Sequence, residues 1–578
     1  MMDKRTLLAF VLIALILILT RPFYEMLGLA PSPGEPDVPT ERVTPGTISP
    51  GLPSEKATRV MPPQEKGSPL PGLEATFDDQ LITVETPLYL ATVSSRGGGT
   101  FESFRLKDYL THQGTPVDLL RNRSGSDNLL ISLTHVSGNT VSLEHPFQMI
   151  TDVIPGDTLS VTWESQTLTF RSELEAGEVT KSLTFHPDSY VIDVSMDLSA
   201  VSRSTVSQER FLLTWDQGLP ITESNAVEDV REFAGFLYQG GERIKKKHKK
   251  DDPQEVFAPG RTDWTSIRSK YFTAAFIPRD ESHLGQILAY PYDPGDLNPP
   301  PAPRYRMAVG FSSRHPVTCS LYLGPLKYSR IKRLKVDLEE TMSFGWVLFR
   351  PFSKGVLLLL TGMHKFVPNY GILLIVVSIL VKIVVYPLTR KSYHSTKEMQ
   401  AIQPLIADLR VKHKGDPQRL NRATMNLYKE HGVNPLGGCL PMLLQMPLLI
   451  ALFIVFRTTI ELRAAPFVWW IKDLSAPDAL IPLGTPLPIL GWDQISLLPL
   501  LMGASMFVQQ RMMGTPAAAQ QKLMSYFMTG FFILIFNSFP SGLNLYYTLF
   551  NVLTILQQKY LTHPPKPTPV PSPSKKKR

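Results

Sequence analysis

The chain has 578 residues, which is too many for one ordinary domain, and a formal net charge of +8 at neutral pH. Its mean hydropathy is near zero, but this average conceals a division, because the last third has the composition of a membrane protein and most of the rest that of a soluble one. The Lys and Arg clusters therefore indicate cytoplasmic segments by default, rather than a nucleic-acid-binding surface.

The N-terminal segment 1–29 combines basic residues with an unbroken apolar run, Leu7–Leu19. This pattern is typical of a signal peptide and equally of a retained membrane anchor, and both interpretations place the following residues outside the cytoplasm. Segment 30–72 is rich in Pro, Ser and Gly. It has too few apolar side chains to form a core, so we predict a disordered periplasmic tether.

From residue 73 to residue 338, short runs such as TLSVTWE and KSLTFH alternate apolar and polar side chains between turn residues. This period-two pattern predicts a large antiparallel β-sandwich. The basic run Arg243–Lys250 lies between two such strands, and we interpret it as an exposed hairpin loop. The domain has no metal-ligand spacing, phosphate-binding loop or nucleophile elbow, so we expect no metal, no cofactor and no enzymatic reaction.

Segment 343–367 mixes aromatic, basic and leucine residues and is interrupted at Pro351, which is typical of an amphipathic helix at a membrane interface. The apolar segment 371–388 is just long enough to span a bilayer. It contains Lys382, about 10 Å from the basic end of the segment, with Ser378 on the same face. The two side chains indicate a polar line that faces a wet interior. The alternative is that Lys382 only extends to the headgroups.

Segment 390–434 is polar and is predicted to be a cytoplasmic helical hairpin, with Leu405, Leu409, Leu420, Met425 and Leu427 at helical spacing. Its cations could contact lipid headgroups, a nascent chain or ribosomal RNA, or could only set the orientation of the protein. The cations that we single out are Arg390, Lys391, Arg410, Lys412, Lys414, Arg419 and Arg422.

Four further membrane spans are predicted, at about 441–460, 495–510, 523–538 and 543–558. Gln445 is the lone polar side chain of its span and is expected to face protein or water. The basic, proline-rich tail 562–578 is predicted to be cytoplasmic. With the N-terminal run, the chain crosses the membrane six times and has both termini inside. Because Cys319 and Cys439 then lie on opposite sides, we predict no disulfide.

Several long motifs occur in a fixed order: YPLTRKSY at 386–393, LYKEHGVNPLGGCLPMLLQMP at 427–447, ELRAAPF at 461–467 and FPSGLNLYY at 539–547. On these motifs the chain resembles the YidC family of membrane protein insertases. WTSIRSKYFTAAFIP at 264–278 and LYLGPLKY at 321–328 resemble the large periplasmic domain of the Gram-negative members.

The resemblance implies an uncleaved N-terminal anchor, a periplasmic β-supersandwich, and a five-helix insertase core at 368–561 in the bacterial inner membrane. In that family the core encloses a hydrophilic groove, open to the cytoplasm, with one positive charge. Most members have an arginine where this chain has Lys382. By the same matching, Ser378, Gln445 and Tyr547 are groove or substrate-contacting residues. The implied partners are nascent membrane proteins, a Sec-type translocon, the ribosome and the lipid bilayer.

Both lines of reasoning predict a membrane protein insertase and chaperone without covalent chemistry. A charged, wet groove would shorten the hydrocarbon barrier that a polar segment must cross. The first alternative is a multispan solute transporter with a charged site at the membrane midplane. The second is an envelope assembly factor that acts through the sandwich, with the helices as its anchor.

Overall fold

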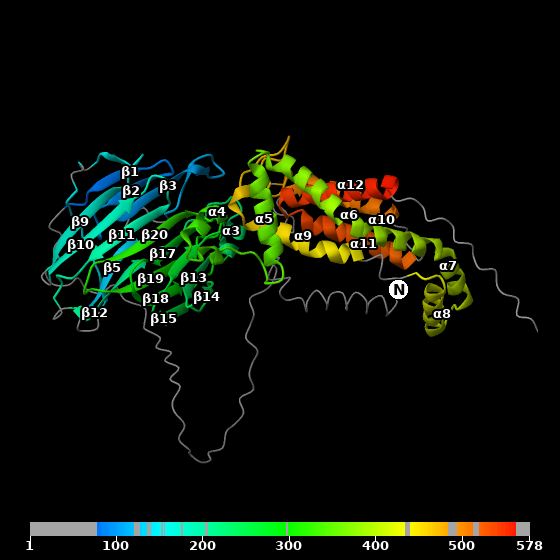
Figure 1. Cartoon of the computed structure of the whole chain (residues 1–578), viewed down its shortest axis with the longest axis horizontal. Helices are drawn as coiled ribbons and strands as arrows, with labels where there is room; N and C mark the ends of the chain where they lie inside the picture. Colours follow the sequence, from blue (N-terminus) through cyan, green and yellow to red (C-terminus); the bar gives the residue numbers. More distant parts are fainter. Residues whose placement is uncertain are drawn as a thin grey trace, which may run out of the picture. The chain divides into compact units, whose positions relative to one another are not determined.

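The structure is a computed structural model that describes residues 78–120, 128–135, 140–151, 154, 156–174, 177–202, 206–295, 297, 299–433, 440–483, 494–512 and 519–561. The predicted anchor 1–29, tether 30–72 and tail 562–578 lie outside these residues, as does Cys439, whereas Cys319 is a buried free thiol. The chain divides into two compact units, Met1–Thr341 and Met342–Arg578, and each is described by itself (Figure 1).

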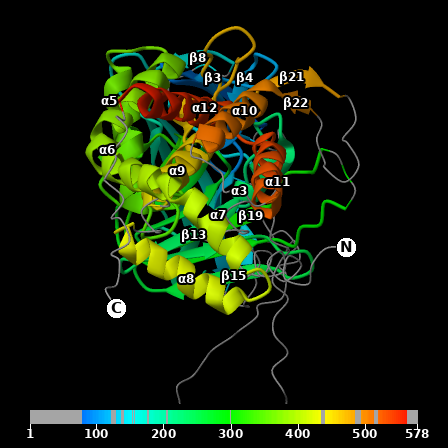
Figure 2. The same cartoon turned by 90° about the vertical axis from the view of Figure 1, so that its right-hand side faces the viewer.

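The first unit contains three β-sheets, most of whose strands are labelled in Figure 1 and some again in the turned view of Figure 2. The nine-stranded sheet has the order β14 (Glu242–Lys246), β13 (Ala234–Gln239), β16 (Trp264–Arg268), β17 (Phe272–Pro278), β20 (Val317–Pro325), β11 (Val191–Asp197), β10 (Gly177–Phe185), β9 (Gln166–Leu174), β7 (Gln148–Met149). The six-stranded sheet has the order β15 (Gln254–Pro259), β18 (Ser282–Ala289), β19 (Tyr305–Ser312), β12 (Val206–Trp215), β5 (Asn128–His135), β6 (Thr140–Ser142). The five-stranded sheet has the order β4 (Pro116–Asp118), β3 (Thr100–Leu110), β2 (Tyr89–Ser94), β1 (Leu81–Glu85), β8 (Thr158–Ser160).

The sheets pack face to face, which confirms the predicted β-sandwich. In β10 the buried residues alternate with half-buried ones, as the period-two pattern requires. Gly235 of β13 lets the nine-stranded and six-stranded sheets approach closely, because a Cβ atom there would lie 2.5 Å from the Ile287 side chain of β18. Phe101 of β3 packs edge-on against Phe185 of β10, with ring centroids 6.5 Å apart. The nine-stranded sheet therefore shares core side chains with both of the others.

The basic run Arg243–Lys250 is not simply a hairpin loop. Its first four residues belong to β14, an edge strand that pairs with β13 from Gly235 to Gln239. Charged side chains are common on edge strands, where they prevent pairing with other chains. The sequence did not reveal this strand because its repeated lysines hide the apolar alternation that marks the other strands. Short helices, α3 (Ala226–Glu232), α4 (Tyr328–Ile331), η1 (Lys332–Leu334) and η2 (Leu338–Thr341), complete the described part of this unit.

A buried lysine fastens the tight turn Gly97–Gly99 inside the sandwich. All three glycines have positive φ, and a Cβ atom at any of them would lie less than 3 Å from a core side chain. The amine of Lys181, on β10, is fully buried. It donates hydrogen bonds to the carbonyl oxygens of Leu129, Gly97 and Gly99, at 2.5, 2.9 and 3.4 Å. The lysine thus satisfies three buried backbone acceptors, two in the turn and one in β5.

The second unit is helical, apart from the small hairpin of β21 (Ala479–Pro482) and β22 (Gln494–Ser496). Its helices are α5 (Arg350–His364), α6 (Tyr370–Ala401), α7 (Gln403–Lys412), α8 (Pro417–Glu430), α9 (Leu440–Thr458), α10 (Leu497–Met512), α11 (Ala519–Phe536) and α12 (Ser541–Leu556), with the short turns η4 (Ile460–Leu462) and η5 (Gln557–Leu561). Helix α12 packs against α10 and α6, and α5 packs against α9.

Two helix boundaries differ from the sequence prediction. Pro351 occupies the first turn of α5 and therefore begins that helix rather than interrupting it, because a first-turn proline loses no backbone hydrogen bond. Helix α6 continues well beyond the predicted span to Ala401, with Pro387 inside it. Among the described helices, only the segment Tyr370–Pro387 of α6 is long and apolar enough to qualify by itself as a membrane span, and Met446–Thr458 and Tyr526–Phe536 are shorter apolar helices.

Replacing Lys181 by methionine is expected to lower the free energy of unfolding of the sandwich by roughly 2–4 kcal/mol, because three buried carbonyl groups lose their donor. The measurement is urea unfolding of the full chain in detergent, followed through the buried tryptophans Trp215 and Trp264. The control is Lys107→Met, which removes only a surface ion pair with Glu85 and should change stability by less than about 0.5 kcal/mol. Equal destabilisation by the two variants would contradict this role of Lys181.

Candidate functional site

The amine of Lys382 turns from α6 toward α12. Its Nζ donates a 2.6 Å hydrogen bond to Oγ1 of Thr554 and lies 4.1 Å from the ring centroid of Phe550. The Thr554 hydroxyl in turn donates to the Phe550 carbonyl at 2.7 Å, which leaves its oxygen free to accept from the amine. None of the ion pairs among the described residues includes Lys382. The positive charge is therefore held by a hydroxyl and an aromatic face, not neutralised by a carboxylate.

Other polar contacts continue from this point through the helices. On α12, Asn551 lies three residues before Thr554 and donates to Oγ of Ser505 on α10 at 3.1 Å. On α10, Gln510 accepts a 3.4 Å hydrogen bond from Thr529 of α11. These contacts link α6, α12, α10 and α11, and we call the residues that make them the polar line: Lys382, Thr554, Asn551, Ser505, Gln510 and Thr529.

Five members of the polar line were missed in the sequence. Ser505, Asn551, Thr554 and Thr529 are each an isolated polar residue within an apolar helix, which is the signal that pointed to Gln445. Gln510 instead stands between Gln509 and Arg511, at the polar end of α10. Sequence spacing alone does not indicate which of these polar side chains meet, because that depends on which helices are neighbours.

The other predicted groove residues occupy different surroundings. Ser378 lies on the same face of α6 as Lys382, but it is completely buried and its hydroxyl donates to the carbonyl of Leu374 at 2.7 Å. Tyr547 lies two turns before Thr554 on α12 and is half-buried, with its ring 5.8 Å from that of Phe536 on α11. The side chain of Gln445 lies outside the described residues. The structure thus places Tyr547 beside the polar line and Ser378 in packing between helices.

Helices α7 and α8 form a hairpin beyond the end of α6, as Figure 1 shows. Its core consists of Ile402, Ile406 and Val433, packed against Met399, Leu427 and Tyr428. Leu405 and Met425, predicted at helical spacing, are instead exposed. The apolar face is therefore displaced by about one residue from the predicted one.

Most of the predicted cations of this hairpin are on its surface. Arg390, Lys412, Lys414, Arg419 and Arg422 are exposed, Arg410 is half-buried, and the side chain of Lys391 lies outside the described residues. Arg419 forms an ion pair of 3.1 Å with Asp416, which also caps the start of α8. The remaining exposed cations form no ion pair among the described residues, so the hairpin presents a positive surface.

A set of hydrogen bonds that we call the terminal clamp joins the N-terminal ends of α10 and α12. A carboxylate oxygen of Asp478 accepts from the backbone N–H groups of Leu497 and Leu498, at 3.0 and 2.8 Å, and from the indole of Trp470 at 3.2 Å. The N–H of Ser541 donates to the Ala476 carbonyl at 2.7 Å. The loop between α9 and β21 thereby holds the first turns of both helices.

The surroundings of Asp478 are unusual for a carboxylate. Burial raises the pKa of its carboxyl group, and the N–H donors lower it in part. Charge-assisted hydrogen bonds to a helix N-terminus stabilise such an anion.

Among the described residues no group of three or more His, Cys, Asp or Glu side chains is arranged to hold a metal ion.

Family models match both units of the chain. The model described as the 60Kd inner membrane protein matches residues 362–567, and the model of the YidC periplasmic domain matches residues 81–354. The curated proteins that are similar include two named membrane protein insertase YidC. One, from Chlorobaculum parvum, is 36% identical over 84% of this chain and 83% of its own length. The other, from Chlorobium luteolum, is 35% identical over 97% of this chain and 95% of its own length.

Among solved structures, one described as an active YidC insertase with its first transmembrane domain resolved covers 84% of this chain and 93% of its own chain. Its sequence identity is 17% and its TM-score 0.37. Because both values are low, the family assignment rests on the sequence relatives and the family models.

Replacing Asp478 by alanine is expected to destabilise the helical unit by roughly 1–3 kcal/mol, because the N–H groups of Leu497 and Leu498 lose a charged cap. The measurement is the apparent Tm of the purified full chain in detergent. The control is Asp408→Ala, because Asp408 is an exposed acid on α7. An unchanged Tm for the Asp478 variant would show that the clamp does not hold the two helices.

Proposed function

Because this chain belongs to the YidC family of membrane protein insertases, we propose that α6, α9, α10, α11 and α12 form the insertase core and that the polar line receives the polar part of an arriving membrane protein. The family is one of bacterial inner-membrane proteins with a periplasmic domain and without an enzymatic reaction. It does not favour the alternative of a solute transporter.

The observation that carries the proposal is the position of Lys382. An ammonium group in an apolar helix is costly when it faces lipid, and such groups are mostly found facing a bundle interior or a water-filled cavity. Here the amine bonds to Thr554 and has no carboxylate partner among the described residues. The amine is therefore available to attract an acidic side chain of a client protein. A lysine whose only role was a structural ion pair would already be paired with a carboxylate of the chain.

The neighbouring helices offer a path for the apolar part of a client. Helix α11 exposes Tyr526, Phe527 and Leu534, and α9 exposes Met446. A hydrophobic segment that contacts these side chains while its polar flank remains near Lys382 would be transferred to lipid by apolar partition. No covalent step is needed. Gln445 and Ser378 would lie near the path of this client segment.

We also propose the orientation of the chain. Six spans, counting segment 1–29, place both termini and the α7–α8 hairpin in the cytoplasm. The exposed cations of that hairpin support this orientation, because cytoplasmic loops carry an excess of Lys and Arg. The same cations could contact a ribosome that delivers a nascent chain, or the protein could work beside a Sec-type translocon.

Replacing Lys382 by alanine is expected to reduce insertion of a single-span client with an acidic external tail by roughly tenfold, because the client's acidic residues lose their counter-charge. Lys382→Arg should keep most activity, since the charge remains. The measurement is protease protection of the translocated tail in proteoliposomes that contain only the purified chain.

Two further variants separate charge from packing. Thr554→Val removes the hydrogen-bond partner but keeps the amine, so its defect should be smaller than that of Lys382→Ala. Lys472→Ala removes an exposed lysine of the loop after α9 and should have no effect. Full insertion by the Lys382→Ala protein would exclude the charge as the functional group, without bearing on the fold.

A further inference from the structure

Exposed aromatic and large aliphatic side chains gather at one end of the helical unit, on the connections between its helices. Phe366 and Trp469 are the most exposed of them, at 86% each. Exposed apolar patches usually mark a contact with a membrane or with another protein. We call the whole set the apolar collar, and it consists of Trp346, Val347, Leu348, Phe366, Val468 and Trp469.

The loop after α9, residues 463–478, is fixed at the start of three helices. A Cβ atom at Gly371, in the first turn of α6, would clash with the Phe467 side chain of the loop. The Ser541 hydroxyl, at the start of α12, donates to the Asp473 carbonyl at 2.7 Å. With the terminal clamp at α10, these contacts hold the loop at the end of the bundle where α6, α10 and α12 begin and α9 ends.

The tip of this loop is a tight turn with a tryptophan in a position that favours glycine. The N–H of Ile471 donates to the Val468 carbonyl, and the N–H of Phe467 donates to the Ile471 carbonyl, each at 3.0 Å. Trp469 is the first central residue of this turn and has a φ of 50°. Turns with a positive φ at that position are dominated by Gly, Asn and Asp, and a bulky side chain there is strained.

The surrounding contacts prevent the turn from relaxing. The N–H of Ala464 donates to the carboxylate of Asp473 at 3.1 Å. The indole of Trp470 donates to Asp478 of the terminal clamp, and its ring stacks on that of Trp469, with centroids 5.9 Å apart. A fixed loop therefore presents the Trp469 indole outward at a cost in backbone conformation. Strain of this kind clusters at functional positions.

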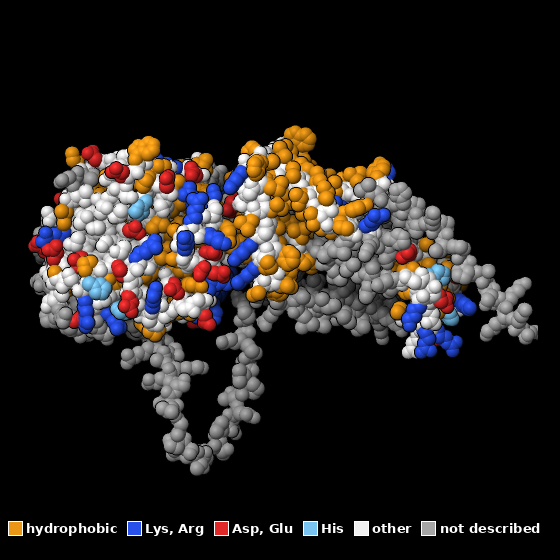
Figure 3. Space-filling view, viewed as in Figure 1, with side chains coloured by type: hydrophobic (Ala, Val, Ile, Leu, Met, Phe, Trp, Pro, Cys, Tyr) orange, Lys and Arg blue, Asp and Glu red, His pale blue; other side chains and the backbone are white. Residues whose placement is uncertain are grey.

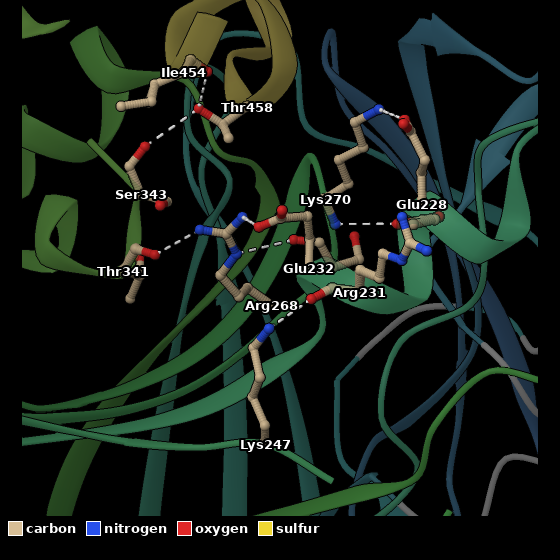
Figure 4. Close-up of polar contacts among 12 residues, drawn as sticks. Glu228, Arg231, Glu232, Lys247, Arg268, Lys270, Thr341, Ser343, Ile454 and Thr458 are labelled. Atoms are coloured by element: carbon tan, nitrogen blue, oxygen red, sulfur yellow. Dashed lines mark hydrogen bonds and ion pairs between the residues drawn. The ribbon is translucent and has the colours of Figure 1, made fainter. Parts of the chain in front are cut away.

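A second connection brings further collar residues to the same end. The Thr458 hydroxyl, in the last turn of α9, donates to the Ile454 carbonyl at 2.8 Å and lies 3.3 Å from the Ser343 carbonyl (Figure 4). Gly345 has a φ of 77°, and a Cβ atom there would clash with the Ile454 side chain. The chain is therefore packed against the end of α9 directly before the collar residues 346–348.

The collar is continuous with the apolar face of α6. The segment Tyr370–Pro387 is long and apolar enough to span a membrane, and it exposes Ile372, Ile379 and Ile383. Figure 3 shows hydrophobic side chains over much of the visible surface of the helical unit. Phe366 lies four residues before this segment begins. The collar thus lies at the level of one end of the span, where a headgroup region would begin.

The chemistry and placement of the collar favour lipid over a protein partner. Tryptophan is enriched where a bilayer meets water, because its ring is apolar and its N–H can bond to water or headgroups. The collar residues come from three separate connections, 343–349, 365–369 and 463–478. These connections share the end of the bundle at which they lie, and a bilayer interface selects side chains by that level.

We propose that the apolar collar lies in the headgroup region of the membrane and anchors this end of the helical unit among phospholipids. In the orientation proposed above, on which this inference rests, that end is the periplasmic one. Because Trp470 stacks on Trp469 and binds Asp478, the lipid contact would also support the terminal clamp, and with it the first turns of α10 and α12.

The test locates the Trp469 indole in proteoliposomes of the purified full chain. Trp469→Phe removes one of the seven tryptophans, so the fluorescence that this variant lacks is the Trp469 signal. Phosphatidylcholine brominated near the headgroup end of its acyl chains should remove most of this signal. Lipid brominated near the chain ends should remove less of it, and iodide in the water should have little effect.

The matched control is Trp163→Phe, because Trp163 is 91% exposed but belongs to the sandwich. Its signal should be quenched by iodide and not by the brominated lipids. If iodide quenches the Trp469 signal and brominated lipid does not, the indole lies in water and the proposal is wrong. If neither quenches it, a protein contact such as a second copy of the chain covers the indole, which overturns the proposal as well.

Trp469→Gly tests the strained turn separately. Glycine adopts a positive φ readily, and the strain that it relieves should outweigh its greater freedom in the unfolded chain. The apparent Tm of this variant in detergent should therefore be no lower than that of the unchanged protein. A lower Tm would show that the indole packs within the protein, against the proposal. Neither measurement uses a client protein, so a failure here is distinct from a failure of the insertase proposal, which the Lys382 variants test.

Discussion

A charge in a low-dielectric layer must be compensated, and this constraint explains most of the arrangement of the helical unit. The Lys382 amine is compensated by the hydroxyl of Thr554 and the face of Phe550, so α6 must lie against α12. Asn551 of α12 has the same requirement and meets Ser505 of α10. These two contacts each join a polar group to a neighbouring helix, because an unpaired polar group in hydrocarbon is costly.

The terminal clamp differs from the polar line in the groups that it binds. Within the line the contacts are single hydrogen bonds between side chains, which a client protein could replace. At the N-terminal ends of α10 and α12, Asp478 and the Ala476 carbonyl bind backbone N–H groups that would otherwise have no partner. We infer that the helices are held firmly at one end, while the side chains of the polar line remain exchangeable.

The sandwich is subject to a different constraint, because it must remain folded in water while it is covalently joined to the helical unit. Its core is apolar apart from groups such as Lys181, which binds the carbonyls of Gly97 and Gly99 in a tight turn.

The sequence by itself determined the β-sandwich, the positions of the apolar helices and the presence of a lysine within one of them. These features depend on local periodicity and composition, which any window of the chain displays. It also determined the family, because long motifs such as NPLGGCLPMLLQMP and FPSGLNLYY are specific.

Only the tertiary structure decided which polar groups meet. Thr554 lies 172 residues from Lys382, and Ser505 lies 46 residues from Asn551. Spacing along one helix cannot show such contacts, because they depend on which helices are neighbours and how each is rotated. The same reason explains the exposed Leu405 and the burial of Ser378. It also explains why β14 was missed, since an edge strand is defined by its pairing rather than by its own pattern of side chains.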